Sequence, residues 1–244
     1  MKNMGEELNS EYAIATFCYG DRYNEQTNRM IESFKKIKDT PKIFIVTDNK
    51  NSITKEDFVF VSDIREYDEK YVNYKTNYYD FDFSVKRFSV KFALDSGYTK
   101  IILTDTDVIP NETLFSHKNV LDCFIPNSVS GQVTYLFDDE IKSNSMLGRR
   151  FTHYESKFNV THNKKNMWMP EDCVQFLDIE KEKFYSFLST WDKCIEVKYD
   201  DKLPNIPAGN IDEMCFSALN NGIDLNNNSN KHINLLIPTH DKWY

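Results

Sequence analysis

A short apolar run that ends in two closely spaced aspartates constrains the fold of this chain more than any other feature. The run covers residues 100–104, and Asp105, Thr106 and Asp107 follow it directly. Its aliphatic and β-branched residues predict a buried β-strand. Because residues i and i+2 of an extended chain point the same way, both carboxylates can converge on one point. Ligands of open α/β sheets bind beyond the C-terminal ends of strands, so the run predicts an α/β fold with a site there.

Two carboxylates at this spacing suit Mg²⁺ or Mn²⁺, whose remaining ligands are often substrate phosphates. The plain alternative is a solvated turn or a loop cap, because Asp-x-Asp arises readily in a chain with 38 acidic residues. Three features favour the metal site. The preceding strand is apolar, a helix-like segment ending at Gly97 leads into it, and Pro110 closes the loop.

Strands and helices alternate through the first half of the chain. Apolar runs predict strands at 12–18, 42–48 and 58–61, and helical spacing predicts helices at 24–37 and 83–96. Alternation of this kind implies βαβ units and a mostly parallel, Rossmann-like central sheet flanked by helices.

The second half is less regular. We expect strands at 130–137 and 173–179 and helices at 180–191 and 211–219, whereas 143–165 reads as a basic, irregular loop. The basic residues in or beside this loop could close over a diphosphate or form a plain solvated surface, and we favour the solvated surface. They are Arg149, Arg150, Lys164 and Lys165.

Composition excludes several classes of function. The net charge of −8 argues against a general nucleic-acid or anionic-membrane binder. Five scattered cysteines without paired spacing favour a reduced compartment over a disulfide framework. Residues 1–11 lack the apolar core of a signal peptide, and no run approaches the ~20 apolar residues of a membrane span. These observations predict a cytoplasmic protein.

The order of the motifs resembles the GT-A glycosyltransferases, closest to glycogenin-like and galactosyltransferase-like members. The motifs are Thr16–Gly20 at the end of the first strand, Thr47–Asp48 at the end of the second, Lys86–Arg87, and Asp105–Asp107. The resemblance implies one GT-A domain over 1–244, with a nucleotide-binding half at about 11–110 and a smaller, irregular acceptor-side subregion within about 111–244. It also implies metal-dependent transfer of a sugar, expected to be a hexose, from a nucleoside-diphosphate sugar to a hydroxyl acceptor.

The resemblance assigns roles around the aspartates. Asp105 and Asp107 would hold Mn²⁺ or Mg²⁺ on the donor diphosphate, with Asp107 as direct ligand and Asp105 acting through water or on the ribose. Lys86 would reach the diphosphate or ribose, although a solvated helix face is an equal alternative for it.

The ends of the first two strands would contact the nucleoside of the donor, with a UDP-sugar favoured. Thr16, Phe17 and Tyr19 stand where the family places its base contacts, and Asp48 would bind base or ribose. An aromatic face can stack on a base, but core packing is a strong alternative for Phe17.

The C-terminal segment resembles the family's closing His-Lys region. There His240 would be the third protein ligand of the metal, and Lys242 would contact the diphosphate. The usual glycine after the histidine is missing, and the two residues stand closer together than in those relatives. A frayed terminus is the alternative for His240.

Asp212 and Glu213 resemble the family's acidic pair at a helix start. One of them would contact the acceptor hydroxyl or act as general base. The alternative is that both acids only complement the helix dipole.

Two other functions compete with sugar transfer. A nucleotidyltransferase usually opens with a Gly-rich loop, and the single Gly20 after the first strand disfavours it. A non-catalytic nucleotide-binding or interaction module would keep the fold without turnover. DNA glucosylation gains little support from the acidic charge. The sugar, the acceptor and the stereochemical outcome stay open.

Overall fold

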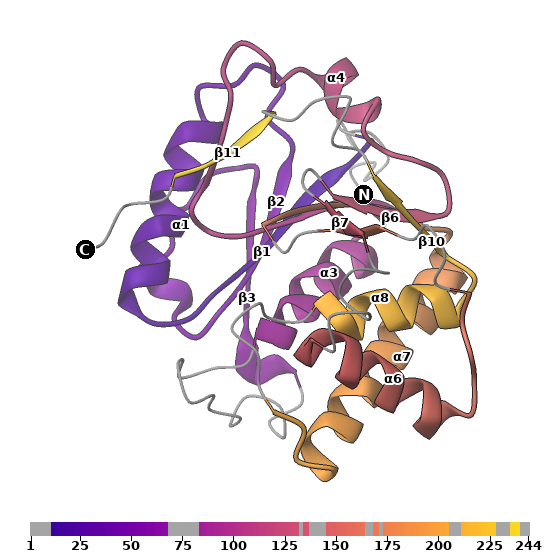
Figure 1. Cartoon of the computed structure of the whole chain (residues 1–244). Helices are drawn as coiled ribbons and strands as arrows, with labels where there is room; N and C mark the ends of the chain where they lie inside the picture. The colour runs from indigo at the N-terminus through magenta and orange to yellow at the C-terminus, as the bar shows by residue number, and fades with distance from the viewer. Residues whose placement is uncertain are drawn as a thin grey trace, which may run out of the picture.

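The computed structural model describes residues 11–67, 83–131, 134–136, 145–163, 168–170, 173–204, 211–227 and 235–239. Its centre is a seven-stranded sheet in the order β10-β6-β9-β4-β1-β2-β3 (Figure 1). β9 runs antiparallel to both of its neighbours, and the other neighbouring pairs are parallel. The α/β class with a mostly parallel central sheet is therefore confirmed.

The strands of the central sheet are short and largely apolar. They are β1 (Ala13–Cys18), β2 (Lys42–Thr47), β3 (Val59–Asp63), β4 (Lys100–Thr104), β6 (Ser128–Gly131), β9 (Val174–Asp178) and β10 (Asp224–Asn227). Two antiparallel ribbons lie beside the sheet. One pairs β5 (Val108–Pro110) with β11 (Leu236–Pro238), and the other pairs β7 (Thr134–Leu136) with β8 (Trp168–Pro170).

Helices cover both faces of the sheet. They are α1 (Asp21–Phe34), α3 (Lys86–Asp95), α4 (His117–Leu121), α6 (Met146–Phe158), α7 (Lys181–Asp200) and α8 (Ile211–Asn220). Short 3₁₀ turns cover Lys50–Ser52 (η1), Ile64–Glu66 (η2) and Phe83–Val85 (η3). None of the described helices is both long and apolar enough to cross a membrane.

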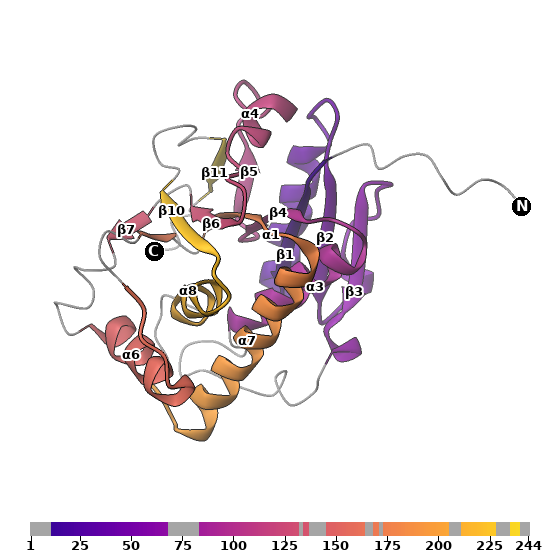
Figure 2. The same ribbon diagram turned by 90° about the vertical axis from the view of Figure 1, so that its right-hand side faces the viewer.

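The two faces of the sheet carry separate hydrophobic cores, and β1 contributes side chains to both. Ala13 and Ala15 belong to the core under α3, α7 and α8, whereas Ile14 and Cys18 belong to the core under α1. This division follows from the alternation of side chains along an extended strand. Figures 1 and 2 show α3, α6, α7 and α8 gathered on one side of the sheet and α1 on the other.

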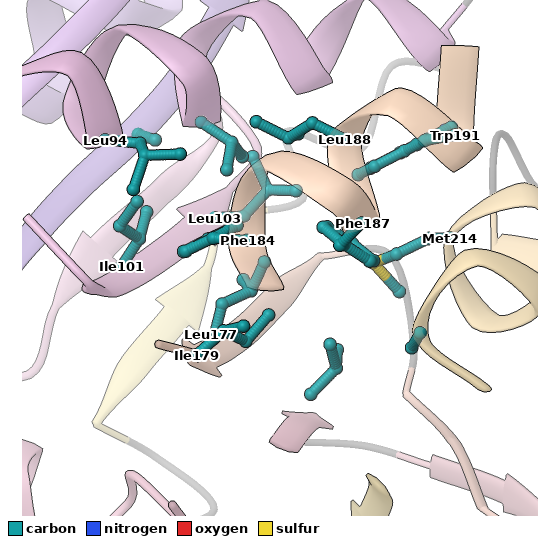
Figure 3. Packing of buried hydrophobic residues seen from close by; sticks show 14 of the residues in the cluster. Leu94, Ile101, Leu103, Leu177, Ile179, Phe184, Phe187, Leu188, Trp191 and Met214 are labelled. Atoms are coloured by element: carbon teal, nitrogen blue, oxygen red, sulfur yellow. The ribbon is translucent and has the colours of Figure 1, made fainter. Parts of the chain in front are cut away.

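The core on the α7 side is built from aromatic and aliphatic side chains of several elements (Figure 3). Phe184 of α7 lies beside the sheet residues Leu103 and Leu177, whereas Phe187 of the same helix lies beside Met214 of α8, and all of these side chains are buried. Burying side chains of this size stabilises the fold by about 1.5–3 kcal/mol each. This core fixes β4, and so fixes where the Asp-Thr-Asp loop begins.

The loop predicted over 143–165 is wrong, because much of it forms α6. Ser145 caps the helix through its side chain, and Asn159 ends it in the left-handed conformation with a φ of 52°. Both are ordinary helix-end signals. Between them, Phe151 and Tyr154 lie on one face and are fully buried. The solvated surface favoured for the basic residues of this segment is wrong for Arg150, which is buried, whereas Arg149 is exposed.

Three other boundaries differ from the predictions. α1 begins at Asp21 rather than at 24, directly after Gly20, whose φ of 79° suits glycine. α7 continues to Asp200, because its buried face includes Cys194 and Ile195 beyond the predicted end. The strand predicted over 130–137 is divided between β6 in the central sheet and β7 in a ribbon.

Candidate active site

The crossover point of the sheet lies between β1 and β4. The chain passes from β1 to β2 and β3 on one side, then returns to place β4 on the other side of β1. Because β1, β2 and β4 are parallel, their C-terminal ends share one edge. Open α/β sheets bind ligands in the crevice at such a point.

A pocket of about 180 Å³ lies there, which we call the switch-point pocket. It is lined by Phe17, Arg22, Tyr23, Gln26, Lys86, Asp105, Thr106 and Asp107. Four of these residues were predicted as site residues from the sequence: Phe17, Lys86, Asp105 and Asp107. The structure therefore brings both aspartates of the motif, the lysine before it and the end of β1 to one cavity.

Every residue of the Asp-Thr-Asp loop is held by a different part of the chain. The Asp105 N–H donates to the Cys173 carbonyl oxygen at 3.1 Å. The Thr106 hydroxyl donates to Gln26 Oε1 at 3.0 Å. The Asp107 carbonyl oxygen accepts from Thr239. A loop anchored at each residue presents its carboxylates in a fixed arrangement, as a preorganised ligand site requires.

The carboxylate of Asp105 is paired with the ammonium of Lys86, the first residue of α3. The Lys86 side chain is 5% exposed, whereas that of Asp105 is 27% exposed and faces the pocket. A buried ammonium requires a counter-charge, so the carboxylate of Asp105 stabilises Lys86 in its buried position. The pair joins α3 to the loop after β4.

Lys86 and Arg87 are adjacent and point to different partners, as expected for neighbours on a helix. Arg87 pairs with Asp192 of α7 and donates to the Ser84 carbonyl oxygen at 2.8 Å. Lys91 pairs with Asp95 at the surface. Of these three cations, Lys86 alone lines the switch-point pocket.

The other strand-end residues predicted as nucleoside contacts lie at the same edge but do not line the pocket. Thr16 is buried, and its hydroxyl donates to the Thr104 carbonyl oxygen at 2.8 Å, so it joins β1 to β4. Asp48 accepts the Gly20 N–H at 3.0 Å and so fixes the start of α1. Tyr19 is half-buried and packs against the α7-side core.

Arg22, Tyr23, Gln26 and Thr106 line the pocket and were missed in the sequence. The first three lie in α1, which begins three residues before its predicted start. Arg22 and Gln26 are four residues apart, so an earlier helix start would have placed both on one face. Thr106 was treated as a spacer, although its hydroxyl bond ties the motif to α1.

His240 and Lys242 lie outside the described residues. The residue that precedes them, Thr239, donates its N–H to the Asp107 carbonyl oxygen at 2.6 Å. Its hydroxyl donates to the same oxygen at 2.7 Å. The described chain therefore ends in contact with the Asp-Thr-Asp loop. Lys164 and Lys165 also lie outside the described residues.

Asp212 and Glu213 lie elsewhere, in a group of buried charges that we call the sealed cluster. Both side chains are fully buried in the first turn of α8. Arg150 of α6 pairs with both, through Nε and Asp212 Oδ2 at 2.7 Å and through a second contact with Glu213. Lys198 of α7 lies 3.2 Å from Glu213 Oε1. Tyr154, which contacts Arg150, completes the cluster.

Burial and neighbouring charges shift the pKa values of groups in the sealed cluster. Burial raises the pKa of the Asp212 carboxyl well above its usual value, with Arg150 opposing the shift and Glu213 adding to it. Burial opposes the charge of Arg150, but the two acids hold the pKa of its guanidinium well above the usual value. Two carboxylates facing two cations form a self-contained group that joins three helices.

The cysteines lie mostly in the interior. None of the five forms a disulfide, and four of them are buried. Burial raises the pKa of the Cys18 thiol to about 11, so it is not a ready nucleophile.

Comparison with known proteins gives structural matches and no sequence matches. No protein-family model and no curated protein matches the chain. Among solved structures, it is similar to galactosyltransferase LgtC in complex with donor and acceptor sugar analogs, with a TM-score of 0.47 and 8% identity over 87% of this chain and 70% of that chain. It is also similar to mouse xyloside xylosyltransferase 1, with a TM-score of 0.45 and 12% identity over 86% of this chain and 82% of that chain. At TM-scores below 0.5 the function has to be argued from this chain's own residues.

Proposed function

We propose that this chain is a metal-dependent glycosyltransferase of the GT-A type, which moves a sugar from a nucleoside-diphosphate sugar to a hydroxyl acceptor. The observation that carries the proposal is the presence of Asp105 and Asp107 in one pocket at the crossover of a parallel sheet. That crevice is where an α/β sheet binds nucleotides. The carboxylates add what a diphosphate needs there, a place for a divalent cation.

The donor atoms in the pocket fit Mg²⁺ or Mn²⁺. Both ions prefer oxygen ligands, and Mg²⁺ is often bound by one or two carboxylates together with substrate phosphates. Within the described ranges, no three His, Cys, Asp or Glu side chains form a metal-binding group, so diphosphate oxygens would supply part of the shell. We propose His240 as a further ligand, because the residue before it contacts Asp107. A bound cation would supply Lewis-acid stabilisation of the leaving diphosphate.

Different residues of the pocket can bind different parts of the donor. Lys86 holds Asp105 in place and sets a positive charge where the leaving diphosphate gains negative charge. Tyr23 offers aromatic surface on which a base can stack. Phe17 also lines the pocket, but it is 5% exposed and packs in the α7-side core, as its alternative predicted. Uracil is the favoured base, from the resemblance in sequence.

The remaining donor contacts are assigned by place in the chain. Thr16, Tyr19 and Asp48 stand at the same sheet edge and are proposed to shape the nucleoside site. Lys242 is proposed to contact the diphosphate from the C-terminal segment. A cytoplasmic location and the lack of a nucleic-acid partner stay predictions from the sequence.

The catalytic role predicted for Asp212 and Glu213 stays a prediction, and their contacts define how to test it. Both acids are fully buried and paired with Arg150, so either would have to leave that pairing to reach a hydroxyl group. Glu213→Gln separates the two roles. If the acid is a base, kcat falls by about 100-fold or more while the protein stays folded and binds donor normally. If the acid is structural, activity follows the folded fraction.

Release of nucleoside diphosphate from a panel of UDP- and GDP-sugars tests the proposed function. We expect release from one donor with Mn²⁺ present, faster with a sugar acceptor, and abolished by EDTA. The control is Asp122→Asn, at an exposed position after α4, which should behave as the unaltered protein. Donor binding without turnover on any acceptor would instead identify a non-catalytic module.

A further inference from the structure

Thr239 links the C-terminal strand to the Asp-Thr-Asp loop. Its N–H and its hydroxyl both donate to the Asp107 carbonyl oxygen, at 2.6 and 2.7 Å. The two residues are 132 positions apart in the sequence. Two donors from one residue on one acceptor restrict the direction of the carbonyl as well as its distance. The peptide group after Asp107 cannot rotate without breaking both bonds.

The strand that delivers Thr239 is itself firmly docked. β11 pairs with β5 in the register Leu236↔Pro110, Ile237↔Ile109 and Pro238↔Val108. The next opposed pair in this register is Thr239 with Asp107. Leu235 and Leu236 are fully buried in the α1-side core. Thr239 therefore has a fixed position from which to hold the loop.

Strand pairing in the β5–β11 ribbon does not by itself explain the hydrogen bond from the Thr239 hydroxyl to the Asp107 carbonyl oxygen. Continued pairing of β11 with β5 accounts for the backbone N–H bond, because main-chain bonds follow from the register. It does not require a side chain on the same carbonyl. The carbonyl and the carboxylate of Asp107 belong to one residue, so restricting its backbone also restricts where its carboxylate lies in the pocket.

We propose that Thr239 is a positioning residue of the cation site, which sets the orientation of Asp107 through its hydroxyl. The proposal rests on the proposed function, because it requires that the pocket binds a divalent cation. It makes docking of β11 and binding of the cation two linked equilibria. Linkage is reciprocal, so a cation that favours the held loop must also stabilise the docked strand.

The affinity for Mn²⁺ alone, measured by electron paramagnetic resonance, tests the proposal in four proteins. They are the unaltered chain, Thr239→Val, Thr239→Ser and the control Thr113→Val. Thr113 also carries a hydroxyl bonded nearby, to Asn111 Oδ1 at 2.8 Å, but it does not line the pocket. Valine keeps the shape of threonine and removes the hydroxyl, whereas serine keeps the hydroxyl.

We expect Thr239→Val to bind Mn²⁺ about 3- to 10-fold more weakly, the effect of losing one hydrogen bond. Thr239→Ser and Thr113→Val should stay within about twofold of the unaltered protein. Equal affinity in Thr239→Val, or equal weakening in Thr113→Val, would overturn the proposal. Failure of the unaltered chain to bind Mn²⁺, both alone and with UDP or GDP present, would instead overturn the proposed function.

Hydrogen exchange keeps the proposal testable if Thr239→Val does not fold. In the unaltered full chain, addition of Mn²⁺ should slow exchange of the Thr239 N–H, because that group donates to Asp107. The Ile43 N–H, bonded to the Phe58 carbonyl oxygen at the far end of β2, serves as reference. Slowing at Thr239 beyond that at Ile43 supports the proposal, and equal change at both contradicts it.

Discussion

The switch-point pocket and the sealed cluster use the same kinds of side chain in opposite ways. In the pocket, Lys86 pairs with Asp105, and the aspartate side chain stays 27% exposed. In the cluster, Arg150 pairs with Asp212 and Glu213, and both acids are fully buried. Each group includes residues from the first turn of a helix, α3 in one case and α8 in the other.

The difference in exposure is what we expect between a ligand site and a structural group of charges. A carboxylate that keeps contact with solvent can exchange water for a cation or a phosphate-bound metal. The acids of the cluster are enclosed with their counter-ions in this structure, and their ion pairs join α6, α7 and α8. Removing a charge from the pocket should therefore affect binding, whereas removing one from the cluster should affect folding.

Arg150→Met should have the largest effect of the substitutions considered, and the effect should be a loss of folding stability. The substitution leaves two buried carboxylates without their main counter-charge, which lowers the free energy of unfolding by about 3–5 kcal/mol. Urea unfolding measures the loss. The matched control is the exposed neighbour Arg149→Met, which should change stability by less than about 0.5 kcal/mol. A loss in the control as large as in Arg150→Met would remove the contrast between buried and exposed charge.

Asp107→Asn should act on binding. An amide cannot supply the carboxylate charge, so Mn²⁺-dependent affinity for nucleoside diphosphate should fall by at least about 100-fold. The unfolding free energy should change by less than about 1 kcal/mol, because the backbone bonds from Thr239 remain. Calorimetric titration and urea unfolding on the same sample give both numbers. A large loss of stability with little loss of binding would reverse the roles assigned to the two regions.

Lys86→Met tests the support of Asp105 and should have a smaller effect. The methionine fills similar space but cannot hold the carboxylate, so Mn²⁺-dependent diphosphate affinity should drop by about 10-fold. Lys91→Met is the matched control on the same helix, since Lys91 is half-exposed and pairs with Asp95 at the surface. Equal affinities in the two variants would show that the pairing with Asp105 does not matter for binding.

Asp212→Asn should show its effect as a change in pH dependence. Burial raises the pKa of Asp212 above its ordinary value near 3.8, so the folded state holds this proton more tightly than the unfolded state. The resulting stability is present at low pH and is lost as pH rises through the folded-state pKa. Asparagine does not ionise, so the variant should gain stability relative to the unaltered protein as pH rises above the ordinary pKa near 3.8. A difference that is constant with pH would contradict the raised pKa.

The pocket could be predicted largely from the sequence because its key residues follow strands. The apolar run before Asp105 and Asp107 predicts a strand, and parallel strands bring their C-terminal residues to one edge. Phe17 and Lys86 were instead assigned from the resemblance to the GT-A family, and both line the pocket. Local pattern and sheet topology were sufficient only for the two aspartates.

The sealed cluster and the Thr239 contact could not be predicted, because they depend on packing between distant segments. Arg150 and Glu213 are 63 positions apart and meet only when α6 packs on α8. No periodic pattern links such residues. The basic residues of α6 also led us to predict a loop, although Ser145 and Asn159 are the cap residues of a helix.

Titration of UDP and GDP into the unaltered protein by calorimetry, first with Mn²⁺ and then with EDTA, tests most directly whether the switch-point pocket is a cation-dependent donor site. The account predicts binding of one diphosphate, UDP being favoured, in the presence of Mn²⁺ and its loss in EDTA. Binding of neither nucleotide under either condition would contradict it.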